Sequence, residues 1–225
     1  MFLMDVSVIV CARNEQKYIG NCLKNLSNQT VRPEIIVVDG HSTDKTVKIA
    51  RKYADKIVED NKKGIADARN IGWKVAKGDI VAYCDADCMP HKDWVKNILR
   101  HMNGNVCVFG PLIPYEGKTK TKIGLKVWGH LFLKASSIFG YPCICTANVA
   151  FKKSVLKKHP FRYQILEDFD VGNRIRKVGK VRFYNDLYMP ISTRRFKEGF
   201  HRLAFKYYLL NYLRLKTGKE MKPYF

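Results

Sequence analysis

The sequence has 225 residues, of which 46% are hydrophobic, so the chain can form one large α/β domain and is not globally disordered. Lys and Arg number 41 against 20 Asp and Glu, which gives a net charge of +21. This excess indicates an anionic partner, which is a nucleic acid, an anionic membrane surface or a phosphorylated substrate.

The seven cysteines form no pattern typical of disulfides or zinc sites. Cys11, Cys84 and Cys107 lie within apolar runs, where a thiol behaves as a small hydrophobic group. Residues 1–10 lack a basic leader, and no apolar run approaches the roughly 20 residues needed to cross a bilayer. We therefore expect a cytoplasmic protein in a reducing environment.

Strands and helices alternate in the first half of the chain. The predicted strands are 6–11, 34–38, 56–58 and 80–84, and the predicted helices are 18–26, a helix from about residue 45, and 64–76. Ser42 or Thr43 can cap the second of these helices. This alternation predicts a parallel sheet with right-handed crossovers.

The alternation fades in the second half. We predict a helix around Trp94 and Leu99, strands at 105–111, 146–151 and 181–184, a helix within 161–179, and basic amphipathic helices at 118–139 and 196–215. We therefore expect one domain over residues 1–195 and a basic amphipathic tail over 196–225.

Two carboxylates follow the apolar run 80–84. Asp85 and Asp87 are separated by one alanine, and the two-residue period of a strand places them on the same face. Mg²⁺ and Mn²⁺ prefer such oxygen ligands, and either cation also binds a diphosphate. An isolated Asp-x-Asp pair is more often a solvated turn, so its meaning depends on the rest of the chain.

Other polar residues end neighbouring strands of the predicted sheet. Glu15 follows the first strand and Asp39 ends the second. The carboxyl ends of parallel strands meet at one edge, so these residues and the Asp-x-Asp pair describe a nucleotide pocket with a metal at its phosphate end. Arg69 can add a cation for the diphosphate, although a solvated helix arginine is the alternative.

With these motifs, the sequence resembles the glycosyltransferase family 2 enzymes of the GT-A fold. The matching stretches are 6–15, 36–44, 64–72, 78–87 and 167–170, in the order and spacing of the family, and the resemblance covers about residues 5–195. It implies a Rossmann-like, mostly parallel central sheet flanked by helices, here followed by a C-terminal amphipathic helix. It also implies metal-dependent, inverting transfer of a sugar from a UDP- or GDP-sugar to an acceptor.

The resemblance assigns the donor-binding residues. Ala12, Glu15 and Asp39 would hold the nucleoside, and Arg69 would touch the diphosphate. The Asp-x-Asp pair would bind Mg²⁺ or Mn²⁺, with Asp87 as the firmer ligand and Asp85 also near the donor.

The resemblance also assigns a general base. Asp168 would take the proton of an acceptor hydroxyl as that hydroxyl attacks the anomeric carbon. The alternative for Glu167 and Asp168 is negative charge favoured at a helix N-terminus. Arg194 and Arg195 stand where many relatives carry basic residues, and we assign them to the donor diphosphate or an acceptor phosphate.

The basic segments 118–139 and 196–215 allow two interpretations. Their apolar faces either cover the sheet or dock peripherally on the cytoplasmic face of an anionic membrane, which would bring the site to a lipid-phosphate or lipid-linked glycan acceptor.

Three other functions fit the sequence less well than glycosyl transfer. A sugar nucleotidyltransferase normally has a Gly-rich phosphate loop after its first strand, which 11–15 is not. Nucleic-acid binding is suggested by charge alone, without a recognition motif. The intact Asp85, Asp87 and Asp168 argue against a non-catalytic nucleotide-sugar binder.

Overall fold

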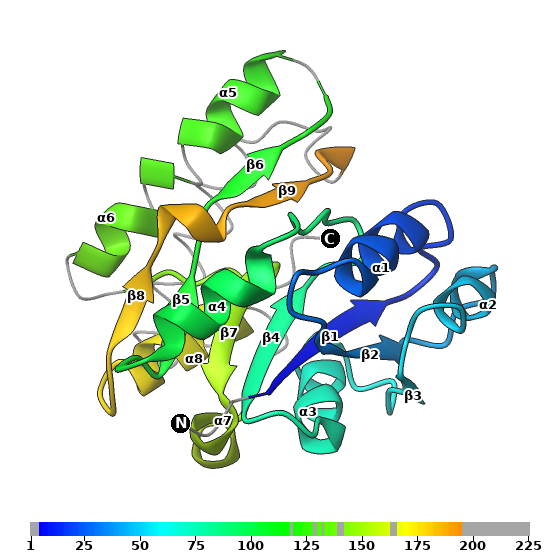
Figure 1. Ribbon diagram of the computed structural model, residues 1–225, viewed down its shortest axis with the longest axis horizontal. Helices are drawn as coiled ribbons and strands as arrows, with labels where there is room; N and C mark the ends of the chain where they lie inside the picture. Colours follow the sequence, from blue (N-terminus) through cyan, green and yellow to red (C-terminus); the bar gives the residue numbers. More distant parts are fainter. Residues whose placement is uncertain are drawn as a thin grey trace.

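The computed structural model describes residues 5–117, 119–127, 130–131, 133–138, 142–162 and 166–194 (Figure 1). Its main sheet has seven strands in the order β3-β2-β1-β4-β7-β5-β8. The strands are β1 (Val6–Ala12), β2 (Glu34–Asp39), β3 (Lys56–Glu59), β4 (Ile80–Cys84), β5 (Cys107–Phe109), β7 (Asn148–Lys152) and β8 (Val181–Phe183). Only β7 runs antiparallel to its neighbours among these strands, so the predicted mostly parallel sheet is confirmed.

Helices cover both faces of the sheet (Figure 1). Alternate side chains of each strand point to opposite faces, so Val8 and Val10 belong to one apolar cluster and Ile9 to the other. The first cluster includes residues of α1 (Ile19–Ser27), α2 (Thr46–Ala50) and α4 (Trp94–Met102). The second includes residues of α3 (Ile65–Val75), α6 (Leu133–Ile138), α7 (Lys153–Lys158) and α8 (Glu167–Ile175).

Gly72 brings α3 unusually close to β1. A Cβ atom at this position would lie 2.5 Å from Cγ2 of Ile9, so a larger residue would displace the helix or the strand. The closeness of α3 to the central strands therefore depends on glycine at this position.

A second, two-stranded sheet pairs β6 (Leu112–Pro114) with β9 (Met189–Ile191) in parallel. β9 also approaches the loop after β4, because Cys88 forms a bridge with Ile191 and the amide of Ser192 donates to the carbonyl of Asp87 at 3.2 Å. Residues 192–194, which follow β9, are thereby brought to the Asp-x-Asp pair.

Some predicted elements differ from the structure. The helix predicted over 118–139 is represented by two helices, α5 (Thr119–Val127) and α6, while residues 118, 128–129, 132 and 139 lie outside the described residues. The predicted helix 196–215 lies outside them as well. Within the described part of the chain, no helix is both long and apolar enough to cross a bilayer.

The predicted cap of α2 is also wrong. Its first amide, from Thr46, donates to Oδ1 of Asp44 at 2.9 Å, while the hydroxyl of Ser42 instead donates to Asp39. Lys45 occupies the N-cap position without a side-chain cap, and the carboxylate that accepts from the Thr46 amide comes from Asp44, one residue earlier.

Candidate active site

The loops that follow β1 and β2 are joined by side-chain hydrogen bonds. The amide of Asn14 donates to the hydroxyl of Ser42 at 2.9 Å, and Oδ1 of Asn14 accepts from the amide of Thr43 at 2.8 Å. The amide of Glu15 donates to Oγ1 of Thr46 at 2.7 Å. These bonds hold the backbone of Glu15 at the carboxyl edge of the sheet.

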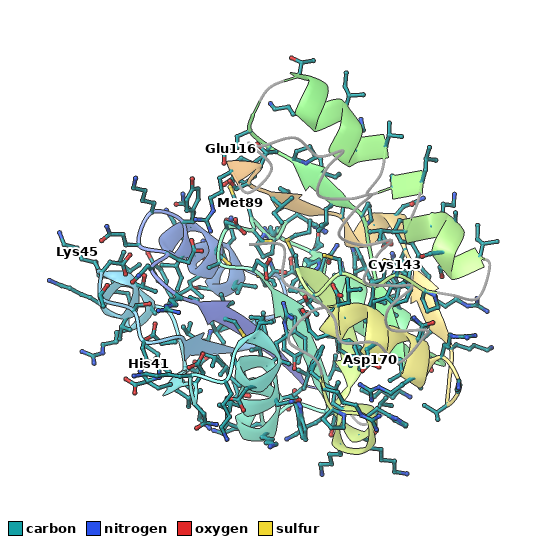
Figure 2. All side chains as sticks on the ribbon, turned by 180° about the vertical axis from the view of Figure 1, so that it is seen from behind. His41, Lys45, Met89, Glu116, Cys143 and Asp170 are labelled. Carbon is teal, nitrogen blue, oxygen red and sulfur yellow. The ribbon has the colours of Figure 1, made fainter. Side chains whose placement is uncertain are left out.

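A cavity of about 700 Å³ opens at this edge. Residues that follow three adjacent strands line it, together with the start of α3; they include Ala12, Glu15, Gly40, His41, Asp60 and Ile65. Figure 2 shows His41 just beyond the end of β2. The volume lies within the range of roughly 300–1,000 Å³ that is typical of small-molecule sites.

The residues predicted to hold the nucleoside occupy different positions around this cavity. Ala12 and Glu15 line it, and the carbonyl of Ala12 accepts from the amide of Gly40 at 2.8 Å. Asp39 is buried, and Ser42 donates to its carboxylate through the hydroxyl at 2.6 Å and the amide at 3.0 Å. Asp39 therefore shapes the loop after β2, and its contact with a nucleoside stays a prediction.

Asp60 is a cavity residue that the sequence interpretation missed. It follows β3, accepts from the amide of Lys62 at 2.9 Å, and its Oδ1 lies 3.4 Å from Nε2 of His41. Asp60 could have been identified from the sequence by its position just after a predicted strand, since Asp39 was predicted as a site residue from its position at the end of a strand.

Asp85 and Asp87 directly follow β4. The amide of Cys88 donates to the carbonyl of Asp85 at 3.0 Å, so a turn replaces the extended strand that we assumed. The side chains are consequently not equivalent, because Asp87 is 3% exposed and Asp85 is only partly buried.

Arg194 neutralises two buried carboxylates at this point. Its Nε donates to Oδ2 of Asp87 at 3.0 Å, its terminal nitrogen pairs with Glu15, and its guanidinium lies 4.5 Å from the ring centre of Tyr18. Burial lowers the pKa of Arg194, but the bonds to Glu15 and Asp87 outweigh this effect and raise it. The predicted phosphate contact stays a prediction, and Arg195 lies outside the described residues.

The chemistry of Asp85 and Asp87 fits a divalent cation. Oδ1 of Asp87 is buried, and among the described residues it has no hydrogen-bond partner. No group of three or more His, Cys, Asp and Glu side chains in this part of the chain could hold a metal by itself. Mg²⁺ is commonly bound by one or two carboxylates together with substrate phosphates, and two carboxylates suit that arrangement.

Buried thiols surround the Asp-x-Asp turn. Sγ of Cys22 lies 3.5 Å from Sγ of Cys84, and all seven cysteines are free. Burial raises the pKa of Cys11 to about 12, with Arg69 opposing this effect and the charges of Asp85 and Asp60 adding to it. Cys11 therefore stays neutral, as predicted, and the three charged side chains that act on it share one region of the edge.

Asp168, the predicted base, is the second residue of α8. Burial raises its pKa, whereas the charge of Arg69 and the backbone N–H groups of Phe169 and Thr146 oppose this effect. Cys145 is partly buried near it, and burial and the charges of Asp168 and Asp85 raise the pKa of this thiol. The amide of Thr146, from which Asp168 accepts, lies two residues before Asn148, which pairs with Cys84 at the end of β4, so Asp168 lies near the Asp-x-Asp turn.

Arg69 is not the solvated arginine that was the alternative interpretation. It is 7% exposed and forms a buried ion pair with Glu167, the residue before Asp168. Its predicted contact with a diphosphate stays a prediction.

Residues 7–159, more than half of the chain, match the family described as Glycosyl transferase family 2. The chain belongs to this family. The family resemblance seen in the motifs is thereby confirmed.

Curated relatives in this family match part of the chain. Glycosyltransferase AglE of Haloferax volcanii is 35% identical over 108 residues, which are 44% of this chain and 36% of AglE. The poly(ribitol-phosphate) beta-N-acetylglucosaminyltransferase TarS of Staphylococcus aureus is 36% identical over 104 residues, which are 42% of this chain and 18% of TarS. These matches span about a third or less of each relative.

Solved structures share the fold of this family 2 chain. The mannosyltransferase PcManGT of Pyrobaculum calidifontis, in complex with GDP-Man and Mn²⁺, superposes with a TM-score of 0.75 at 22% identity, covering 99% of this chain and 67% of that one. Glucosyl-3-phosphoglycerate synthase of Mycobacterium tuberculosis, with Mn²⁺, UDP and glucosyl-3-phosphoglycerate, gives a TM-score of 0.68 at 19% identity, covering 96% and 81%. At these identities the likeness shows the GT-A fold alone.

We predict that Arg194→Gln lowers the unfolding free energy by about 2 kcal/mol, because it removes a positive charge from two buried carboxylates. Chemical denaturation of both proteins measures this difference. Arg32→Gln is the control, because Arg32 pairs with Asp55 at the surface with 55% of its side chain exposed. That variant should lose less than about 1 kcal/mol. Equal losses in the two variants would contradict the role of Arg194.

Proposed function

We propose that this family 2 chain transfers a sugar from a nucleoside diphosphate sugar to an acceptor, with inversion at the anomeric carbon. One observation carries the proposal: the cavity beside Glu15 opens at the ends of β1 and β2, and both the Asp-x-Asp pair and Asp168 lie near the end of the adjacent β4. The fold neighbours solved with GDP-Man and Mn²⁺, or with UDP and Mn²⁺, support a donor of this class.

In this proposal the nucleoside lies in the cavity formed after β1, β2 and β3. Asp39 ends β2 and Asp60 follows the adjacent β3, and carboxylates at this place can accept from the N–H groups of a base or the hydroxyls of a ribose. Both uracil and guanine offer such N–H groups, so UDP- and GDP-sugars are the donors to compare. Arg69, Arg194 and Arg195 are the cations proposed for the diphosphate.

Asp85 and Asp87 would hold Mg²⁺ or Mn²⁺ together with the diphosphate. A bound cation stabilises the negative charge that develops on the departing nucleoside diphosphate. The chain itself contributes the buried Oδ1 of Asp87, which no described hydrogen-bond partner occupies.

Asp168 is the proposed general base. The acceptor oxygen forms a bond to the anomeric carbon while the bond from that carbon to the diphosphate oxygen breaks, and Asp168 takes the hydroxyl proton. A single displacement of this kind inverts the anomeric centre. An acceptor that is already a phosphate oxyanion would need this base less.

The acceptor side of the site carries a basic and apolar surface. No Asp or Glu occurs between Glu116 and Glu167, whereas this stretch contains nine lysines and one arginine. Ile123, Val127, Leu131 and Ile138 are 51–70% exposed, and they are four of the seven exposed large apolar residues in the described part of the chain.

Glu116, at the start of this stretch, is connected to the Asp-x-Asp turn through Ser192. Oγ1 of Thr193, next to Arg194, donates to the carbonyl of Glu116 at 3.0 Å, and Ser192 bonds both Glu116 and the turn. Figure 2 shows Glu116 near Met89, which follows the turn. We propose that an anionic membrane covers this surface and presents a lipid phosphate or lipid-linked glycan to the site.

The first prediction concerns the donor. Mn²⁺ should increase the affinity for UDP or GDP, because the cation joins the diphosphate to Asp85 and Asp87; calorimetric titration measures it. Asp87→Asn should weaken cation-dependent binding by about tenfold or more. Asp93→Asn, an exposed residue with the same change in charge, should not. If neither nucleotide binds better with Mn²⁺ or Mg²⁺, the proposed donor site is wrong.

The second prediction concerns Asp168. Asp168→Asn should keep nucleotide affinity and lower transfer to a hydroxyl by about 10²–10⁴-fold, since the base is lost. Burial raises the pKa of Asp168, so Asp168 is protonated at a higher pH than an ordinary aspartate. As the pH is lowered, the wild-type kcat should therefore begin to fall at a pH above the usual aspartate range. Steady-state kinetics as a function of pH tests both points, and an unchanged kcat in Asp168→Asn would contradict the assignment.

The third prediction concerns the membrane. Val127→Glu should reduce sedimentation with phosphatidylserine-containing vesicles, because it places a negative charge on the apolar surface. Val178→Glu is the matched control, since Val178, in the turn after α8, is 54% exposed and Val127 is 51% exposed. Equal vesicle binding by the two variants would exclude this docking surface.

A further inference from the structure

The side chain of Asn70, on α3, forms two hydrogen bonds with the backbone of Phe161. Its Nδ2 donates to the carbonyl of Phe161 at 2.8 Å, and its Oδ1 accepts from the amide of Phe161 at 3.1 Å. Oδ1 also accepts from Nε1 of Trp73 at 3.0 Å, so the amide group cannot rotate freely. The backbone of Phe161 is therefore tied to α3 before the segment that leads to α8.

The adjacent residue, Arg69, contacts the first residue of α8. It forms an ion pair with Glu167, and the two side chains are 8% and 11% exposed. The carbonyl of Arg69 accepts from the hydroxyl of Tyr83 at 3.1 Å, and its guanidinium lies 5.8 Å from the ring centre of Phe161. Breaking one side of a buried ion pair leaves an uncompensated charge, so this contact constrains Glu167 strongly.

The backbone around this contact requires support. Leu166, the residue before α8, has φ 54°, which lies in the left-handed region that leucine rarely adopts. Asp168 follows two residues later, and its Oδ1 accepts from the amide of Phe169 at 2.8 Å. The conformation of Leu166 and the ion pair of Glu167 thus determine where the first turn of α8 begins.

We propose that Glu167 is a positioning residue, which Arg69 holds in place so that the neighbouring Asp168 is kept at the acceptor hydroxyl. This inference rests on the proposed role of Asp168 as the base. It assigns to the Arg69-Asn70 pair of the 64–72 motif a second role, which is to fasten the segment carrying the base to the helix beside the nucleotide cavity.

The charges around Asp168 distinguish a positioning role of Glu167 from a contribution to packing alone. Arg69 faces it from α3 and Glu167 neighbours it on α8, while Cys143 and Cys145 face it from the segment before β7. Burial raises the pKa of both thiols, so they are neutral near pH 7. Arg69 is therefore the cation that favours the ionised form of Asp168, and Glu167 holds that cation in place.

The test compares Glu167→Gln and Arg69→Gln with Asp170→Asn. Asp170 forms a buried ion pair with Arg174 on the same helix, at 2.7 Å, and it does not contact Arg69. Glu167→Gln should lower the plateau kcat for transfer to a hydroxyl by about ten- to a hundredfold while the nucleotide Kd stays unchanged. Asp170→Asn should lower thermal stability and keep kcat within about twofold.

The pH profile supplies a second readout. Arg69→Gln should move the acid limb of kcat to higher pH, because the cation that favours ionised Asp168 is gone, whereas Glu167→Gln keeps Arg69 and should not move it upward. The double variant should be no slower than the slower single variant, because the two residues act as a unit.

Each outcome decides a different question. A wild-type protein that neither transfers nor hydrolyses a nucleotide sugar would overturn the proposed function. A wild-type protein that turns over, with kcat in Glu167→Gln equal to that in Asp170→Asn, would overturn the positioning role alone. Additive losses in the double variant would show that Arg69 and Glu167 do not act together, which would also overturn it.

Discussion

The shared guanidinium of Arg194 makes the acidic edge of this sheet stable. Parallel strands bring Glu15 and Asp87 to one place, where both side chains are buried and both carry negative charge. Two such groups repel one another and lose their hydration, which costs several kcal/mol unless a cation compensates. Arg194 reaches them because β9 returns to the end of β4, so the small second sheet is a requirement of the site.

The strand order explains how the site is divided. β4 lies at the centre of the sheet, with β1 on one side and the antiparallel β7 on the other. The cavity belongs to the β1, β2 and β3 side, whereas Asp168, on α8, accepts from the amide of Thr146, two residues before β7. The Asp-x-Asp pair follows β4 and therefore lies between the proposed nucleotide cavity and the proposed base.

Much of the fold could be predicted because its strands are nearly continuous runs of Val and Ile. The starts and ends of β1 to β4 agree with the predictions to within one residue. β6 and β9 were missed because each has three residues and exists only through its partner. The α7 helix was missed because six residues after a strand give no helical period.

The site was partly predictable for a related reason. Glu15, Asp39, Asp85 and Asp87 could be chosen from their places at strand ends, and Asp60 by the same rule. The partners of Arg69 and Arg194 could not, because Glu167 and Asp87 are 98 and 107 residues away in the sequence. Charge and spacing predict that a basic residue meets an anion, but only tertiary packing decides whether that anion belongs to a ligand or to the chain.

Gly72 shows how the interior can govern chemistry at a distance. The separation of α3 from β1 is set by a missing side chain, since one added methyl group would meet Ile9. Arg69 and Asn70 lie three and two residues earlier on the same helix; Arg69 pairs with Glu167 at the start of α8, and Asn70 donates to the carbonyl of Phe161. The absence of a side chain at Gly72 thereby sets the distance between α3 and the sheet, and with it the positions of the Arg69 and Asn70 side chains. Substitutions of Gly72 should consequently lower enzymatic turnover as well as the stability of the fold.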